Sequence, residues 1–287
     1  MTKVWLITGS GSGLGREFAE AALAAGDRVV AGARRPGELD ALVERYGARI
    51  TPAELDVRDE VAARAAVQRA VDGYGRLDVL VDNAGYQYNA PFEQITPEAF
   101  RDVIETCLFG VVYTTRAAVP VMRRQRRGHI FQVSSIGGRV TIPGNSPYHA
   151  AKWGVGGFSD SLADEVAPFG VKVCTLEPGG IRTSFARRAG ETLPPLLPDY
   201  EPSVGPTYAM IAAARGTAES DPKRIADVVV QLANTADVPK RLILGTAAAT
   251  YVQQTETARA AEAARFRDLT LSTGFPDAST MPDSPKR

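Results

Sequence analysis

Short apolar runs recur along the chain, and segments with helical periodicity separate them. A run that is apolar without alternation is typical of a strand covered on both faces. Strands that alternate with helices pair in parallel, because a crossover through a helix returns the chain in the same direction. The runs lie in KVWLIT, RVVAGA, RITPAELDV, LDVLVDNAG, HIFQVSS, VKVCTLEPGG and RLILG. The pattern therefore predicts an α/β fold with a doubly wound parallel sheet.

The chain of 287 residues is short enough to fold around one α/β core. We expect a single domain over residues 1–245 and a C-terminal helix with a polar tail over 246–287, the helix covering about 247–268. Within the domain, residues 181–220 contain the proline-rich stretch LPPLLPDYEPSVGP together with apolar side chains. A long irregular segment in a compact domain is usually a binding loop or lid, or else disordered. Because its side chains are too apolar for a segment that stays in water, we expect a lid over a ligand.

The charge balance excludes several classes of partner. Lys plus Arg equals Asp plus Glu, at 33 each, so there is no net field to recruit nucleic acid or an anionic membrane. The basic stretch MRRQRRGH lies at a predicted helix end, where cations stay solvated. No apolar run approaches the ~18 residues of a membrane span. We expect a cytoplasmic protein without an export signal that binds a small molecule.

Cysteine and histidine are too scarce for a metal cage or a disulfide framework. The chain has two of each: Cys107, Cys174, His129 and His149. We therefore expect no metal site, and a reducing compartment fits best.

A glycine-rich loop, TGSGSGLG, covers residues 8–15 between the first predicted strand and the first helix. Glycines let the backbone approach a pyrophosphate closely, and the helix N-terminus presents free N–H groups to it. The pattern G-x-G-x-x-G does not fit, because Leu14 and Arg16 stand where its last glycine belongs. T-G-x-x-x-G-x-G does fit, through Thr8, Gly9, Gly13 and Gly15.

The end of the second predicted strand indicates which dinucleotide the loop binds. An NAD enzyme carries an acid there for the ribose 2′-hydroxyl, whereas an arginine suits the 2′-phosphate of NADP. Here the chain reads Ala33, Arg34, Arg35. We predict NADP(H), with Arg34 as the first candidate for the phosphate and Ser10 as a further one. The alternative, that one or both guanidiniums are merely solvated, stays open, above all for Arg35.

Tyr148 and Lys152 lie four residues apart in SPYHAAKWGV, which has a helical pattern. Residues at this spacing share one helix face. A tyrosine with its usual pKa of ~10 is a poor base at neutral pH, and a nearby ammonium favours the phenolate. We expect Lys152 to make Tyr148 a usable general acid and base. His149 points elsewhere on the helix and is expected to be structural.

These motifs together resemble the short-chain dehydrogenase/reductase family. YHAAK matches its Y-x-x-x-K, DNAG at 82–85 matches its NNAG turn, and PGGIRT at 178–183 matches its P-G-x-x-x-T. Ser135 lies thirteen positions before Tyr148, as in the family. The resemblance extends to about residue 245 and implies a Rossmann-type catalytic domain there. This domain includes the segment 181–220, which we expect from its composition to be the substrate lid.

The resemblance also implies roles for individual residues. Ser135 would hydrogen-bond the substrate oxygen, Tyr148 would exchange the proton, Lys152 would also hold the nicotinamide ribose, and Thr183 would orient the nicotinamide. The expected cofactor-binding residues are Thr8, Gly9, Ser10, Gly13, Leu14, Gly15, Arg34, Arg35, Asp56, Val57, Asn83, Ala84, Gly85, Tyr148, Lys152, Pro178, Gly179, Ile181 and Thr183.

The chain departs from the family pattern at two positions. Asp82 replaces the first asparagine of NNAG, and Cys107 replaces an asparagine that supports a proton-relay water before LFG. A thiol is a weak donor and acceptor, so we predict slower proton exchange with the core chemistry intact. The alternative is that Cys107 simply packs as a small buried hydrophobe.

The sequence therefore predicts an NADP(H)-dependent oxidoreductase that transfers hydride between nicotinamide and a hydrophobic ketone or secondary alcohol. Its general style is similar to bacterial hydroxysteroid-dehydrogenase-like ketone reductases, and the family implies a homodimer or homotetramer. Two alternatives remain: a non-catalytic NADP(H) sensor and an atypical redox-neutral enzyme. The residues after DNAG either line a substrate pocket or only pack the loop: Tyr86, Gln87, Tyr88 and Phe92.

Overall fold

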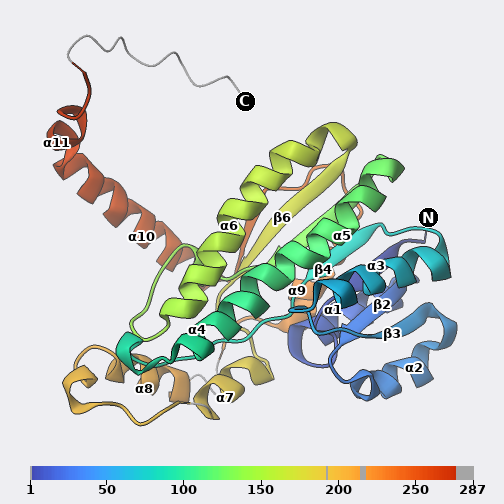
Figure 1. Cartoon of the computed structure of the whole chain (residues 1–287), viewed down its shortest axis with the longest axis horizontal. Helices are drawn as coiled ribbons and strands as arrows, with labels where there is room; N and C mark the ends of the chain where they lie inside the picture. Colours follow the sequence, from blue (N-terminus) through green and yellow to red (C-terminus); the bar gives the residue numbers. More distant parts are fainter. Residues whose placement is uncertain (1, 192, 214–217, 276–287) are drawn as a thin grey trace.

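The computed structural model describes residues 2–191, 193–213 and 218–275. Within them, parallel strands form one seven-stranded sheet in the order β3-β2-β1-β4-β5-β6-β7 (Figure 1). The strands are β1 Val4–Ile7, β2 Arg28–Ala33, β3 Ile50–Glu54, β4 Val79–Asp82, β5 Gly128–Val133, β6 Val171–Pro178 and β7 Arg241–Leu244. The predicted doubly wound sheet is confirmed. The strand order reverses between β1 and β4, and parallel α/β sheets bind their ligands at the carboxyl ends of the strands where this reversal occurs.

Helices cover both faces of the sheet. One face carries α1 (Gly13–Ala24), α2 (Asp40–Tyr46) and α9 (Pro222–Leu232), which pack around the fully buried Trp5 and Phe18. The other carries α3 (Glu60–Tyr74), α5 (Gly110–Gln125) and α6 (Ser146–Val166), which pack around Leu80 and Met122. The strands are therefore apolar on both sides, which is why their sequences do not alternate.

Helix α3 shows how local sequence sets an element's ends. The Asp59 carboxylate accepts hydrogen bonds from the N–H groups of Val61 and Ala62, which caps the first turn. Gly75, with φ of 76°, ends the helix in the left-handed conformation. The buried face consists of Ala63, Ala66, Val67 and Ala70.

The segment 181–220 differs from the irregular lid that the sequence predicts. It contains α7 (Ser184–Glu191) and α8 (Gly205–Ala213), which lie together at one end of the molecule near α4 (Pro97–Ile104) (Figure 1). Pro194, Pro195, Pro198 and Pro202 fall between the two helices, whereas Pro206 lies in the first turn of α8, where its missing N–H breaks no helical hydrogen bond. Thr192 and residues 214–217 lie outside the described residues.

The C-terminal helix α10 (Thr246–Arg265) begins on the body beside β7 and then leaves it, and the short α11 (Arg267–Leu271) follows (Figure 1). Val252 is the last buried residue of α10, and beyond it nearly every described side chain is exposed. The polar tail at 276–287 lies outside the described residues. In the described part of the chain, no helix combines the length and the apolar character needed to cross a membrane.

Candidate active site

The predicted motifs gather at the carboxyl edge of the sheet. The glycine loop follows β1, DNAG closes and follows β4, Ser135 follows β5, and PGG closes and follows β6. Helix α6 then brings Tyr148 and Lys152 against the same edge. Parallel strands deliver loops from distant parts of the chain to one place.

The glycine loop and the DNAG turn are joined by hydrogen bonds. The Thr8 hydroxyl accepts the N–H groups of Asn83 at 2.9 Å and Ala84 at 3.0 Å. The Asn83 side chain donates back to the Thr8 carbonyl at 3.0 Å. A Cβ on Gly15 would lie 2.3 Å from the Gly9 carbonyl oxygen. The loop therefore packs too tightly for any side chain at Gly15.

The start of α1 fits a phosphate group. The helix begins at Gly13, and its N-cap Ser12 makes no side-chain cap. The first N–H groups are therefore not capped by that side chain and can face an anion. Leu14 is buried in the core behind the loop. Ser10 is buried too, and its hydroxyl donates to the Ile7 carbonyl at 2.7 Å, so it supports the loop from inside.

The two arginines after β2 have different surroundings. Arg35 pairs with Glu38, whose carboxylate lies against Gly11 of the glycine loop. Arg34 is exposed and forms no ion pair with a described residue. Asp56 is paired with Arg58 at 2.7 Å. The hydrogen bond from Arg58 holds the pKa of the Asp56 carboxyl below its usual value, and the Arg34 charge adds to this. Val57 is buried beside it, against Gly110.

Tyr148, Ser135 and Lys152 come together as predicted by their spacing, but the electrostatics differ from the prediction. The Tyr148 ring is only 8% exposed, and its hydroxyl hydrogen-bonds Ser135. Burial raises the pKa of the Tyr148 phenol, Cys107 raises it further, and the Ser135 hydrogen bond partly offsets this. The Lys152 ammonium does not counter this rise. It lies over the ring, 5.5 Å from its centroid, and donates to the Val133 carbonyl at 2.7 Å. Burial also lowers the pKa of Lys152.

Ser135 is held by the turn that follows it. Its Oγ accepts the Gly137 N–H at 3.0 Å, and its carbonyl accepts the Gly138 N–H at 2.9 Å. A Cβ on Gly138 would lie 2.9 Å from the Lys152 carbonyl oxygen. The serine turn therefore packs directly on the helix that carries the tyrosine and the lysine.

His149 also holds this turn. Its Nδ1 lies 2.8 Å from the Gly137 carbonyl, and its Nε2 accepts the Ile142 N–H at 3.0 Å. Nε2 is thus the acceptor and Nδ1 the donor of a neutral ring. Burial lowers the pKa of His149, which favours that state. The residue is structural, as the sequence indicates.

Cys107 is buried in a π-helical turn, Glu105–Phe109, between α4 and α5. Its Sγ donates to the Tyr86 carbonyl at 3.2 Å. Burial raises the pKa of the thiol, so it stays neutral near pH 7. A Cβ on Gly85 would lie 3.4 Å from Sγ and 3.7 Å from the Lys152 Nζ. Cys107 therefore packs beside the catalytic candidates, and slower proton exchange stays a prediction.

Asp82 is a buried carboxyl that sequence reasoning noted only as a departure from the family pattern. It accepts hydrogen bonds from the hydroxyls of Thr114, at 2.5 Å, and Thr115, at 2.9 Å. Burial raises the pKa of Asp82 to about 7, although both hydrogen bonds and the Lys152 charge lower it. Thr114 and Thr115 lie on the buried face of α5. No local sequence pattern links these two threonines to Asp82, which is 32 and 33 positions away.

The segment after β6 crosses the glycine loop. The Gly179 N–H donates to the Leu244 carbonyl at 3.0 Å just after Pro178, and Ile181 forms a bridge with Ser220. A Cβ on Gly13 would lie 3.7 Å from the Thr183 Cβ. The structure thus brings Thr183, predicted to orient the nicotinamide, next to the loop predicted to bind the pyrophosphate.

The surroundings of Tyr148 are apolar. Phe185 of α7 lies 6.2 Å from the Tyr148 ring, centroid to centroid. Three more partly buried side chains pack on the same cluster: Tyr88, Ile104 and Leu108. Of the other residues after DNAG, Gln87 accepts a hydrogen bond from Asn145, whereas Tyr86 and Phe92 are exposed. Tyr88 therefore joins the apolar wall, and Phe92 does not.

Across residues 2–191, 193–213 and 218–275, no group of three or more His, Cys, Asp or Glu side chains could hold a metal ion. Cys107 and Cys174 are both free and buried.

Comparisons with known proteins agree with this geometry. The sequence model described as short chain dehydrogenase matches residues 3–194. Oxidoreductase BOA17 of Botryotinia fuckeliana is 43% identical over 273 residues, covering 95% of this chain and 99% of its own. A 3-ketodihydrosphingosine reductase of Bacteroides thetaiotaomicron is 38% identical over 183 residues, 64% of this chain and 65% of its own.

Two solved structures have the same fold. A short-chain dehydrogenase from Streptomyces avermitilis has a TM-score of 0.87 and 37% identity, over 96% of this chain and 100% of its own. An alcohol dehydrogenase from Thermococcus sibiricus, complexed with 5-hydroxy-NADP, has a TM-score of 0.69 and 26% identity, over 85% of this chain and 96% of its own. The sequence model covers more than half of the chain, and the Botryotinia fuckeliana relative matches it over nearly its whole length. Together with the glycine loop and the serine, tyrosine and lysine at one sheet edge, these matches show that the chain belongs to the short-chain dehydrogenase family of oxidoreductases.

Proposed function

We propose that this oxidoreductase uses NADP(H) to interconvert a hydrophobic ketone and its secondary alcohol, with Tyr148 as the general acid and base. The observation that carries the proposal is the contact of Tyr148 with Ser135, beside Lys152, at the edge where the glycine loop lies. Bound nicotinamide would supply the hydride for the ketone or accept it from the alcohol.

The proton chemistry follows from the burial of Tyr148. Because burial raises its pKa, the phenol is protonated at neutral pH, which is the state needed to donate to a ketone oxygen. Ser135 shares its hydrogen bond with Tyr148, so one substrate oxygen could contact both hydroxyls and have its developing charge stabilised. In the direction of alcohol oxidation, Tyr148 would need a cationic neighbour to lose its proton, and the positive nicotinamide of bound oxidised cofactor would provide that charge beside Lys152.

The preference for NADP(H) rests on Arg34. It lies at the end of β2 without an ion-pair partner among the described residues, whereas the Arg35 charge is already balanced by Glu38. A guanidinium suits a 2′-phosphate because it offers a fork of N–H donors to the phosphate oxygens. The Thermococcus sibiricus structure, which is complexed with 5-hydroxy-NADP, is consistent with this.

The substrate class rests on the apolar wall around Tyr148. Tyr148 belongs to an apolar cluster on which four side chains pack: Phe185, Tyr88, Ile104 and Leu108. An apolar pocket with a few convergent polar groups is typical of sites for small hydrophobic ligands. Phe185 belongs to α7, which supports a lid function for 181–220.

We also propose that the enzyme is a homo-oligomer of the cytoplasm. Phe266, Leu269 and Leu271 are exposed at the C-terminal end, which favours contact with a second copy. The two free, buried cysteines are compatible with a reducing compartment.

Replacing Tyr148 with Phe tests the proposal. We expect NADPH-dependent turnover of apolar ketones to fall by about 10²- to 10⁴-fold, since a general acid typically contributes that much. NADPH binding, followed by fluorescence, should be retained. Turnover in the Phe variant close to that of the wild type, or failure of the wild type to bind NADPH and NADH, would contradict the proposal.

A further inference from the structure

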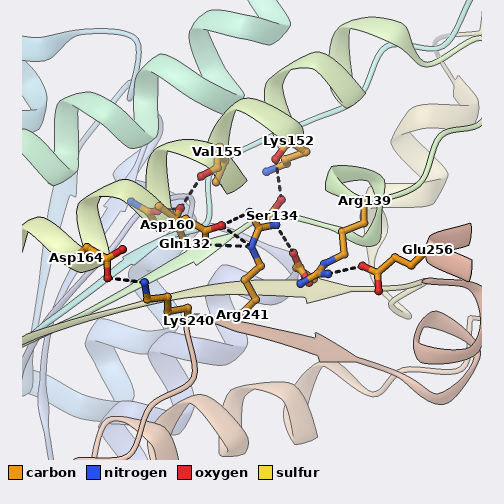
Figure 2. A network of polar contacts seen from close by, with 12 residues as sticks. Gln132, Ser134, Arg139, Lys152, Val155, Asp160, Asp164, Lys240, Arg241 and Glu256 are labelled. Atoms are coloured by element: carbon orange, nitrogen blue, oxygen red, sulfur yellow. Dashed lines mark hydrogen bonds and ion pairs between the residues drawn. The ribbon is translucent and has the colours of Figure 1, made fainter. Parts of the chain in front are cut away.

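Arg139 connects the turn that holds Ser135 with the C-terminal helix. Its N–H donates to the Ile136 carbonyl at 2.7 Å, so its backbone belongs to the same turn. Its guanidinium binds two carboxylates. One is Glu177, at 2.7 Å, and the other is Glu256 of α10, at 2.5 Å (Figure 2). Any displacement of Arg139 therefore acts on the serine turn directly.

Glu177 anchors the inner end of this connection. It is fully buried, and it immediately precedes Pro178 of the predicted nicotinamide segment. A buried carboxylate is costly unless it is paired. Here Arg139 binds one oxygen, and Arg241 of β7 binds the other at 3.1 Å. One carboxylate thus joins the serine turn, β6 and β7.

Arg241 extends the same network to α6. Its guanidinium also binds Asp160 at 2.7 Å. Asp160 is two helical turns beyond Lys152 on α6. The helix with the tyrosine and lysine and the turn with the serine are therefore held to the same two strands.

Helix α10 closes the network from outside. Arg259 donates to the Arg139 carbonyl, and its guanidinium lies 4.8 Å from the centre of the Trp153 ring. Trp153 directly follows Lys152 on α6. Glu256 and Arg259 are three residues apart, so they lie on one face of α10. That face binds the serine turn and the lysine helix at once, although α10 is otherwise exposed beyond Val252.

We propose that Glu256 and Arg259 are positioning residues for the active site, and that α10 acts as an external brace that keeps Ser135 in register with Tyr148. The proposal rests on the proposed function of those two hydroxyls. The brace lies beyond residues 3–194, the part that matches the family's sequence model, so it is not supplied by the family pattern. A brace at this place matters because small displacements of a catalytic group cost rate steeply.

The test compares Glu256→Ala with Glu262→Ala. Both glutamates are exposed on α10, and alanine keeps the helix, but only Glu256 binds Arg139. We expect Glu256→Ala to lower kcat for ketone reduction about tenfold, below the ~10²-fold cost of a 1 Å misplacement. KM and NADPH affinity should stay near wild type. Glu256→Gln, which keeps a hydrogen-bond acceptor, should recover part of the loss.

Hydrogen exchange gives a second readout that does not depend on turnover. In Glu256→Ala, the amides of Gly137, Gly138 and Arg139 should exchange faster, whereas Glu262→Ala should leave them unchanged. Arg259→Ala should reproduce both effects and serves as the second variant if Glu256→Ala does not fold.

Two results would overturn the brace. The first is that these three amides exchange at the same rate in Glu256→Ala, Arg259→Ala and Glu262→Ala. The second is that the amides exchange faster in Glu256→Ala while its kcat stays equal to that of the wild type. If the wild-type enzyme reduces no ketone, the proposed function fails, and amide exchange alone then shows whether α10 holds the serine turn.

Discussion

Asp82 is a buried carboxyl with a raised pKa, and its effect on the stability of the fold has a definite sign. In the folded protein its pKa is about 7, against an ordinary value of 3.8. Between pH 4 and 7 the folded protein therefore holds a proton that the unfolded chain has released. The free energy of unfolding should fall as pH rises through this window, by as much as about 4 kcal/mol from this group, and level off above it.

Asp82→Asn should remove that contribution. The amide can still hydrogen-bond both Thr114 and Thr115, but it carries no charge to bury. Relative to the wild type, the variant should be stabilised at pH 8, with the advantage shrinking toward pH 4 in urea unfolding. Asp227→Asn, on the exposed side of α9, is the control and should follow the wild type throughout. An advantage for Asp82→Asn that does not change with pH would exclude a buried carboxylate as its cause.

At the scale of elements, replacing a helical glycine with alanine should destabilise the protein in α1 and stabilise it in α3. Gly15→Ala would place a Cβ 2.3 Å from the Gly9 carbonyl, a backbone atom that cannot move without opening the loop. NADPH affinity should fall, and the protein should lose stability. Gly73→Ala in α3 meets nothing within 4 Å, so it should gain about 0.5–1 kcal/mol from helix propensity.

Both variants can be compared by thermal unfolding and NADPH titration in one buffer. If Gly15→Ala lost stability but kept full NADPH affinity, the prediction that the glycine loop binds the nucleotide would be wrong.

The elements that could be predicted are those that a local sequence pattern determines. The unalternating strands, the glycine loop before α1 and the Tyr148–Lys152 spacing each follow from local sequence, and the structure contains all of them in the expected order. The electrostatics of Tyr148 could not be predicted, because the Lys152 ammonium binds the Val133 carbonyl, on a strand that the helix spacing does not reveal. Likewise, the contact between Arg139 and Glu256 spans 117 positions and follows no periodicity.

At the scale of the whole molecule, nucleotide binding should appear as added stability. A ligand that binds only the folded state at 100 times its Kd adds about 2.7 kcal/mol, or roughly 5–10 °C in Tm for a chain of this size. At equal concentrations NADPH should raise Tm more than NADH, since only NADPH offers a phosphate to Arg34. Calorimetry of Arg34→Ala provides the control: the difference between the two nucleotides should shrink. Equal shifts in the wild type would contradict the preference for NADP(H).

The attachment of α10 also limits how this enzyme can be recombined with its relatives. A chimera joined after residue 245 would keep Arg139 and Trp153 from one parent and receive positions 256 and 259 from the other. Unless the donor has an acidic residue at 256 and a basic residue at 259, the hybrid would keep both parental parts intact and still lose the contacts between them. Directed evolution that exchanges C-terminal segments should therefore carry these four positions as one unit.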